Sequence, residues 1–124
     1  TQRQLIEKHV RAEAEEQAYQ QLEAHPEQHV LVLSATGWHE GVLGIVAGRL
    51  KEKFNKVVAV INFDDAGLGK GSARAIPGFS LGSTILASCQ HGILQAGGGQ
   101  DMAAGLSVNT DKLEEFQKFI EKHA

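Results

Sequence analysis

The amino-acid sequence predicts an α/β (α+β) fold, in which helices flank a small mixed sheet of about four or five strands and a long helix comes first. Short runs rich in Val, Ile and Leu, such as VLVL and VVAVI, are typical of buried strands, and the segments between them space their apolar residues as helices do. The resulting order is helix, strand, helix, strand, strand, helix, strand, helix. A chain of 124 residues fits one domain with a real core.

Composition and charge narrow the classes of function. With 42% hydrophobic and 22% charged residues the chain is an ordinary globular one, and Cys89, its only cysteine, can form no internal disulfide. No apolar run approaches the roughly 20 residues of a membrane span and no signal peptide opens the chain, so we expect a cytoplasmic protein without membrane contacts. The net charge of −3 lies in residues 1–28, with three basic and six acidic side chains, because residues 29–124 hold nine of each. Any nucleic-acid contact must therefore be local.

Residues 1–25 predict a helix that stops before Pro26. Its apolar stripe is narrow and recurs every four residues, at Ile6, Val10, Ala14, Ala18 and Leu22. The residues alone leave two alternatives, a surface helix of this domain or a connector that leads from an upstream one. Because the opening TQRQ lacks an initiator methionine, we expect a fragment of a longer protein.

Residues 29–63 predict a strand (HVLVLSA), a helix (VLGIVAGRLKEKF) and a second strand (KVVAVINF). The helix has inward apolar positions at Val42, Val46, Leu50 and Phe54. Glycine is a poor helix former, so three glycines at helical spacing suggest a face that presses closely against another backbone. They are Gly41, Gly44 and Gly48.

The rest of the chain predicts two strands and two helices. The strands are GKGSARAI and MAAGLSV. SLGSTILASCQH is a helix with Ser80 or Ser83 as its N-cap and Gly92 as its stop. The tail TDKLEEFQKFIEKH is an amphipathic helix with Leu113, Phe116 and Ile120 inward.

Three polar segments are candidates for a ligand site. In GWHEG, Trp38 and His39 precede a helix whose free N–H groups favour an anion, although Trp38 could instead pack in the core and His39 cap the loop. In GKGSAR, Lys70, Ser72 and Arg74 occupy alternate positions, hence one face of a strand, and suit phosphate oxygens. The alternative for this second segment is a solvated edge strand.

The third segment, AGGGQDMAAG, predicts a loop in which Gly97 to Gly99 let the backbone approach a phosphate closely. No catalytic set accompanies these segments. The acidic FDD at 63–65 has no second Asp or His cluster to complete a metal site, and the histidines are scattered without ligand spacing. The residues by themselves therefore predict a module that binds an anion, with no catalytic group and no bound metal.

Together these segments resemble a known family. GWHEGVLGIVAGRLKEKFNKVVAVI, GKGSARAIPGFSL and AGGGQDMAAGLSV are similar, in order and spacing, to the C-terminal DHH-associated domain of RecJ-type single-strand-specific DNA exonucleases. The opening RQLIEKHVRAEA resembles the helix that connects this domain to the catalytic one. The resemblance implies a connecting helix at 1–28 and a nucleic-acid-binding domain at 29–124.

The resemblance also implies a division of labour. An upstream DHH domain, absent from these residues, would hold two Mn²⁺ or Mg²⁺ ions for 5′–3′ exonuclease chemistry, while this domain binds single-stranded DNA against it. Ser72 and Arg74 fall on positions expected to contact phosphate, and Gly98 and Gly99 on the glycines of a Gly-Gly-His motif. Gln100 replaces that histidine and can donate a hydrogen bond but carry no charge. The alternative function is an RNA- or nucleotide-binding domain of another DHH-type phosphoesterase or of an alanyl-tRNA-synthetase-like protein.

Overall fold

The computed structural model describes residues 2–124 and confirms the predicted fold of helices flanking a mixed sheet. The sheet has five strands in the order β1-β2-β3-β5-β4; β1 and β2 are parallel and the other neighbours antiparallel. The strands are β1 (Val30–Thr36), β2 (Val57–Phe63), β3 (Leu68–Arg74), β4 (Ala96–Gly99) and β5 (Ala103–Asn109). The helices are α1 (Gln2–Ala24), α2 (Leu43–Phe54), α3 (Leu81–Gln90) and α4 (Leu113–Lys122), with short 3-10 turns η1 (Glu40–Val42) and η2 (Thr110–Lys112).

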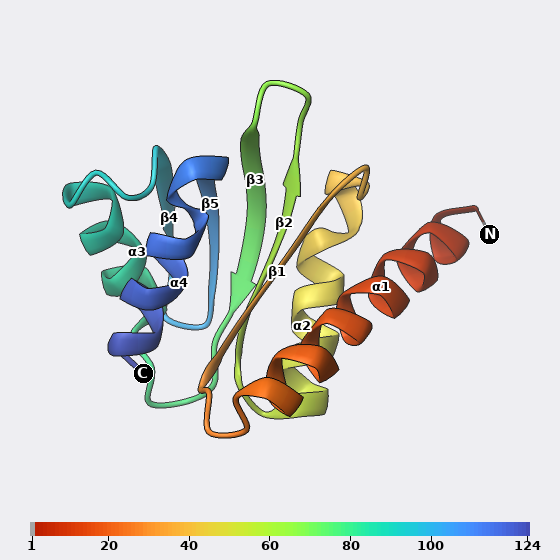
Figure 1. Cartoon of the computed structure of the whole chain (residues 1–124), viewed down its shortest axis with the longest axis horizontal. Coiled ribbons are helices and arrows are strands. Elements are labelled where there is room, and N and C mark those ends of the chain that lie inside the picture. Colours follow the sequence, from red (N-terminus) through yellow and green to blue (C-terminus); the bar gives the residue numbers. More distant parts are fainter. Residues whose placement is uncertain (1) are drawn as a thin grey trace.

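The helices form two layers, with α1 and α2 on one side of the sheet and α3 and α4 on the other (Figure 1). Strand β2 is buried on both faces, which explains its unbroken apolar run. Its residues Val57, Ala59 and Ile61 belong to the core under α3 and α4, whereas Val58 and Val60 belong to the core under α1 and α2. None of the helices within residues 2–124 has the length and apolarity needed to cross a membrane.

Helix α1 packs on this domain along its predicted stripe, since Val10, Ala14 and Ala18 are buried. Its glutamines also bond the free edge of β1, where the amide of Gln17 accepts from the Ser34 N–H (3.0 Å) and donates to the Ser34 carbonyl (2.8 Å). Gln21 donates to the next outward carbonyl, that of Val32, at 2.9 Å. The helix is therefore a packed part of the domain; that it also connects to an upstream domain stays a prediction.

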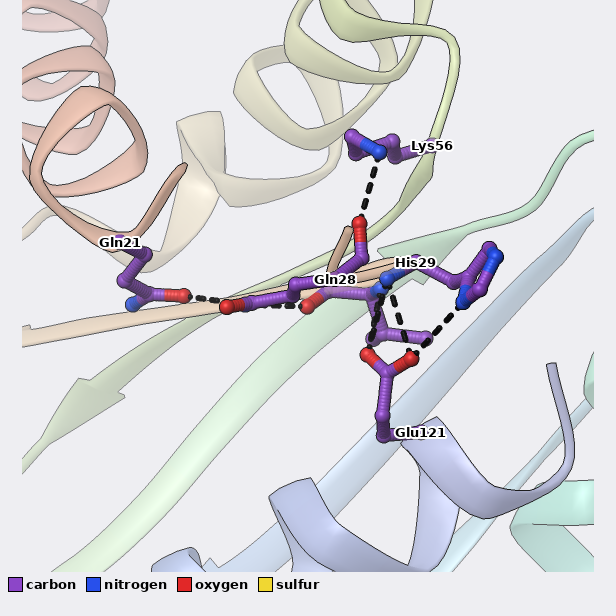
Figure 2. A network of polar contacts seen from close by, with 6 residues as sticks. Gln21, Gln28, His29, Lys56 and Glu121 are labelled. Atoms are coloured by element: carbon purple, nitrogen blue, oxygen red, sulfur yellow. Dashed lines mark hydrogen bonds and ion pairs between the residues drawn. The ribbon is translucent and has the colours of Figure 1, made fainter. Parts of the chain in front are cut away.

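The segment between α1 and β1 is held by the C-terminal helix (Figure 2). The Glu121 carboxylate of α4 accepts from the backbone N–H of His29 at 3.0 Å and of Val30 at 2.9 Å, and lies 3.1 Å from Nδ1 of the His29 ring. Lys56, just before β2, donates from Nζ to the Gln28 carbonyl at 2.7 Å. These bonds fix the entry into β1 from two directions.

The prediction that the glycines of the second helix press against another backbone is wrong. A Cβ on Gly48 would have nothing within 4 Å, and one on Gly41 would meet only side chains, chiefly the ring of His39 at 2.9 Å. At Gly44 the nearest neighbour is a side chain from β3, the guanidinium of Arg74. Only one of the three glycines, Gly44, is thus closely approached by a strand. The group that approaches it is a charged side chain and not a backbone.

Candidate functional site

One face of the sheet is only partly covered. Residues paired across antiparallel strands share a face, so the side that carries Val58 and Val60 on β2 continues onto β3, β5 and β4. Helix α2 reaches β3, whereas on this side neither α1 nor α2 packs across β5 and β4. We call the exposed part the open half of this face; its residues are Lys70, Ser72, Arg74, Ala96, Gly98, Ala103, Gly105 and Ser107.

The predicted row on β3 is confirmed as a structural feature. Lys70 is exposed, Ser72 and Arg74 are half-buried, and all three lie on the open half, while Ala73 between them is buried on the other side. Among residues 2–124, no carboxylate lies within ion-pair distance of Lys70 or Arg74. Neither cation is therefore neutralised by a carboxylate of these residues.

The Arg74 guanidinium lies against helix α2. Its Nη1 donates to the Ala73 carbonyl at 2.8 Å, and its Nη2 would be 2.7 Å from a Cβ placed on Gly44. The hydroxyl Oγ of Ser72 is 3.6 Å from the same Cβ position. Arg74 and Ser72 thus meet at the boundary between the covered part of the face and the open half.

The floor beside this row is formed by small residues. Ser107, Gly105 and Ala103 stand opposite Lys70, Ser72 and Arg74 in the ladder between β3 and β5. A Cβ on Gly98 would meet nothing within 4 Å and one on Gly105 only the Gly71 carbonyl at 3.9 Å. A shallow hollow results, lined by Lys70, Gly98, Gly105 and Ser107 among others. The sequence signal that could have predicted this hollow is the row of small residues at alternate positions of AAGLSV.

The prediction that Gly97 to Gly99 form a loop is wrong, because they belong to the edge strand β4. Only Gln100 to Met102 form the turn into β5, with the Gln100 N–H donating to the Ala103 carbonyl at 2.8 Å. A Cβ on Gly97 would lie 2.7 Å from Cγ2 of Ile85, and one on Gly99 would lie 2.7 Å from Cβ of Ala104. Packing against α3 and β5 therefore requires two of the glycines, and only Gly98 faces the open half.

The outer edge of β4 also differs from a phosphate loop. Since Gln100 pairs with Ala103 through a hydrogen bond, the alternation of an antiparallel ladder turns the Gly98 amide toward β5. The same alternation points the Gly97 and Gly99 amides away from β5, along the free edge of the sheet. Backbone donors are present here, but they lie at an edge and not on the open half.

Trp38 and His39 do not join the row on β3. Trp38 is only 3% exposed, its indole N–H donates to Glu13 at 2.8 Å, and its backbone N–H donates to the Asn62 side chain at 3.0 Å. His39 is exposed and accepts from the Gly41 N–H through Nδ1 at 3.0 Å, in a groove lined by the first turns of α1. Packing and capping, the alternatives given for these two residues, describe their places in the structure.

The described residues do not form a metal centre. Within residues 2–124, no three His, Cys, Asp or Glu side chains gather in a way that could hold a metal ion. Asp64 accepts from the backbone N–H groups of Ala66 and Leu68 and so organises the turn between β2 and β3. The site therefore offers two cations and two hydroxyls beside a surface of small residues.

Comparison with known proteins relates the chain to nucleases. It is 45% identical over 85 residues to the single-stranded-DNA-specific exonuclease RecJ of Dickeya dadantii, which covers 65% of this chain and 14% of that protein. It is 35% identical over 99 residues to the protein of that name from Bacillus subtilis, which covers 79% of this chain and 12% of that protein. The chain thus spans about one seventh or less of the curated relatives it matches.

Solved structures agree with this relation. The crystal structure of RecJ from Thermus thermophilus in complex with Mg²⁺ matches 98% of this chain and 18% of its own, with a TM-score of 0.79 and 28% identity. The C-Ala domain of alanyl-tRNA synthetase from Aquifex aeolicus matches 75% of this chain and 87% of its own with a TM-score of 0.63, but at 14% identity it shows the fold alone. The family model of the DHHA1 domain matches residues 27–124, which is most of the chain, and the chain therefore belongs to the DHHA1 domain family.

Proposed function

We propose that this chain is the strand-holding domain of a RecJ-type single-strand-specific exonuclease, and that the open half binds the sugar-phosphate backbone. The observation that carries the proposal is the row of Lys70, Ser72 and Arg74, whose two cations have no carboxylate partner among the described residues and stand beside a floor of small residues. The names of the RecJ relatives supply the substrate, single-stranded DNA.

The three side chains suit phosphate in different ways. Lys70 is a point charge, Ser72 offers a hydroxyl donor, and Arg74 presents a planar fork that binds two oxygens at once. Alternate residues of a strand are about 6.6 to 6.8 Å apart, so the row extends for about 13 Å. That length allows contact with more than one phosphate of an extended strand.

The open half contains no aromatic side chain on which a base could stack. Trp38 is buried, and Tyr19, which is exposed, belongs to α1. Base stacking is what gives many single-strand-binding proteins part of their affinity, whereas phosphate contacts are independent of sequence and sensitive to salt. We therefore propose binding through the backbone, with little preference for base sequence.

Hydrolysis is proposed to occur in a DHH domain elsewhere in the same protein, in the 5′–3′ direction. Structures of RecJ were solved with Mg²⁺ and with Mn²⁺. The side chains of residues 2–124 do not fit a metal ion, so no step of this proposal uses one held by this chain. The role of the domain is to hold the strand.

The test is fluorescence anisotropy with single-stranded DNA, single-stranded RNA and a mononucleotide over a range of salt concentrations. Arg74→Ala is expected to weaken DNA binding by about 1 to 3 kcal/mol, and Arg74→Lys to restore only part of it because the ammonium cannot bind two oxygens. Arg49→Ala is the matched control. It also removes one arginine and its positive charge, but Arg49 is already paired with Glu7 at 2.9 Å.

Two results would overturn the proposal. One is equal affinity of Arg74→Ala, Arg49→Ala and the unchanged protein. The other is a preference for the mononucleotide with no salt-dependent DNA binding, which would support the alternative nucleotide-binding function.

A further inference from the structure

We infer that Gly44 of α2 is a positioning residue, whose missing side chain makes the seat in which the Arg74 guanidinium is held. The inference rests on the proposed function, because it concerns the residue that would clamp phosphate. A Cβ on Gly44 would lie 2.7 Å from Nη2 and 3.6 Å from Cζ of Arg74. The space that any other residue would fill at position 44 is occupied by the guanidinium.

Backbone conformation does not explain the glycine. The glycines of this chain with positive φ are Gly37, Gly67, Gly78 and Gly92, and Gly44 is not among them. Its place in the first turn of α2 suits an alanine, which would favour the helix by up to about 1 kcal/mol. A helix that forgoes this gain next to a half-buried arginine is consistent with a requirement for space.

The seat fixes the guanidinium from several sides. Gly44 bounds it on the side of the helix, the Ala73 carbonyl accepts from Nη1 at 2.8 Å, and the Ser72 hydroxyl lies beside the same space. A long side chain that is already ordered loses less rotamer freedom when it binds a phosphate, so its contact is stronger. A methyl group at position 44 forces the guanidinium to shift, which the flexible side chain can do without disturbing the fold.

Helix α2 supplies a matched control one turn later. Gly48 is also half-buried, but a Cβ there would meet nothing within 4 Å. Gly44→Ala and Gly48→Ala make the same chemical change in the same helix. Any difference between them in nucleic-acid binding therefore reports the contact with Arg74.

The experiment measures binding of a single-stranded oligodeoxynucleotide by the whole protein, with divalent metal removed by a chelator to prevent cleavage. The variants are Gly44→Ala, Gly48→Ala, Arg74→Ala and Gly44→Ala with Arg74→Ala. Gly44→Ala is expected to weaken binding about 3- to 10-fold and Gly48→Ala to leave it unchanged. The double variant should bind as Arg74→Ala does, because the methyl group has nothing left to displace.

Salt dependence gives a readout that a purely structural role would not move. Loss of one phosphate contact lowers the slope of log affinity against log salt by about 0.7 for a single strand. Arg74→Ala should show this loss in full and Gly44→Ala a large part of it. Gly48→Ala should keep the original slope.

The outcomes separate the inference from the proposed function. If Arg74→Ala binds normally, the proposed role of Arg74 fails. If Arg74→Ala weakens binding but Gly44→Ala matches Gly48→Ala, or binds more tightly than the unchanged protein, the inference fails and the function stands. The inference would also fail if Gly44→Ala weakened binding as much in the Arg74→Ala protein as it does in the unchanged protein.

Thermal unfolding tests whether any loss of stability in Gly44→Ala comes from the contact with Arg74. If Gly44→Ala lowers the Tm, adding Arg74→Ala removes the clash and should return the Tm to that of Gly48→Ala with Arg74→Ala. A Tm that stays low in the double variant would show that position 44 needs glycine for another reason, and the inference would fall.

Discussion

The face of the sheet under α1 and α2 is hydrophobic core over β1 and β2 and open surface over β5 and β4, with β3 at the boundary. Leu31, Leu33, Val58 and Val60 make up the sheet's part of the covered half and are fully buried. The same alternation of side chains leads to Gly105, two strands beyond β2, and to Gly98, three strands beyond it, with open space above them. Whether a strand face becomes core or binding surface is decided here by how far the helical layer extends.

Charges show the same contrast. In the covered half, Arg49 and Lys53 of α2 lie 2.9 and 3.0 Å from carboxylates of Glu7 and Glu15 on α1. The hydrogen bond that Lys53 donates to the Glu15 carboxylate, and after it the nearby Tyr19 side chain, raise the pKa of Lys53. The acidic excess of the first helix is thus used locally, to dock α1 onto α2. The net charge of −3 therefore says little about the open half.

The largest effect that we expect from this contrast between the two halves is on stability. Leu33→Ala in the covered half is expected to lower the free energy of unfolding by about 2 to 5 kcal/mol, because Leu33 is fully buried and its truncation leaves a cavity. Ser107→Ala in the open half should change it by no more than about 0.5 kcal/mol. Chemical denaturation monitored by circular dichroism measures both. Similar losses for the two variants would mean that the open half is as tightly packed as the core.

A second test separates binding from stability within the open half. Gly105→Val places a branched side chain on the floor, where the nearest atom to its Cβ is the Gly71 carbonyl at 3.9 Å. Stability should hold or rise by up to about 1 kcal/mol, because valine suits a strand better than glycine does. Affinity for single-stranded DNA should fall by about tenfold or more. A loss of about 1.4 kcal/mol of binding free energy is enough for a tenfold change.

The control for this variant is Thr36→Val, at the exposed end of β1. It places the same side chain, valine, on a strand outside the open half and should leave affinity unchanged. Normal binding by Gly105→Val would exclude the floor of the open half from the contact.

The row on β3 could be predicted from sequence because it depends on local periodicity alone. Lys70, Ser72 and Arg74 alternate, and a strand of that length must place them on one face. The stripe of α1 and the inward residues of α4 were predictable for the same reason, and both are confirmed. What local patterns could not indicate is that none of the helices in residues 2–124 covers β5 and β4 on this side.

Strand β4 and the neighbour of Gly44 could not be predicted from local sequence patterns. Three glycines in succession indicated a loop whose backbone approaches a ligand closely, yet β5 pairs with them, and contacts with Ile85 and Ala104 exclude side chains. At Gly44 helical spacing indicated a close neighbour but not that it would be Arg74, which comes from a strand far along the chain. Both features depend on contacts between distant segments, which a single sequence does not display.

The smallest effect is expected at the turn beside the open half, and it rests on the proposed exonuclease. Gln100 is exposed at the start of the turn between β4 and β5, where the family resemblance leads us to expect histidine. Gln100→His should raise the single-turnover cleavage rate of the whole enzyme by about two- to fivefold, because a histidine can carry a positive charge beside the phosphate. The gain should be larger below the ordinary histidine pKa of about 6.5 than at about pH 8, since only the protonated ring is charged.

Gln95→His is the control for this variant, because Gln95 is also exposed but lies just before β4, at the other end from the turn. It introduces the same titrating group into the same hairpin, so a general effect of added charge would raise the rate in both variants. A gain confined to Gln100→His and increasing toward low pH would extend the comparison, since the turn would then share the anion-binding character of the open half. An equal or lower rate, or a gain that does not vary with pH, would contradict a role for charge at this position.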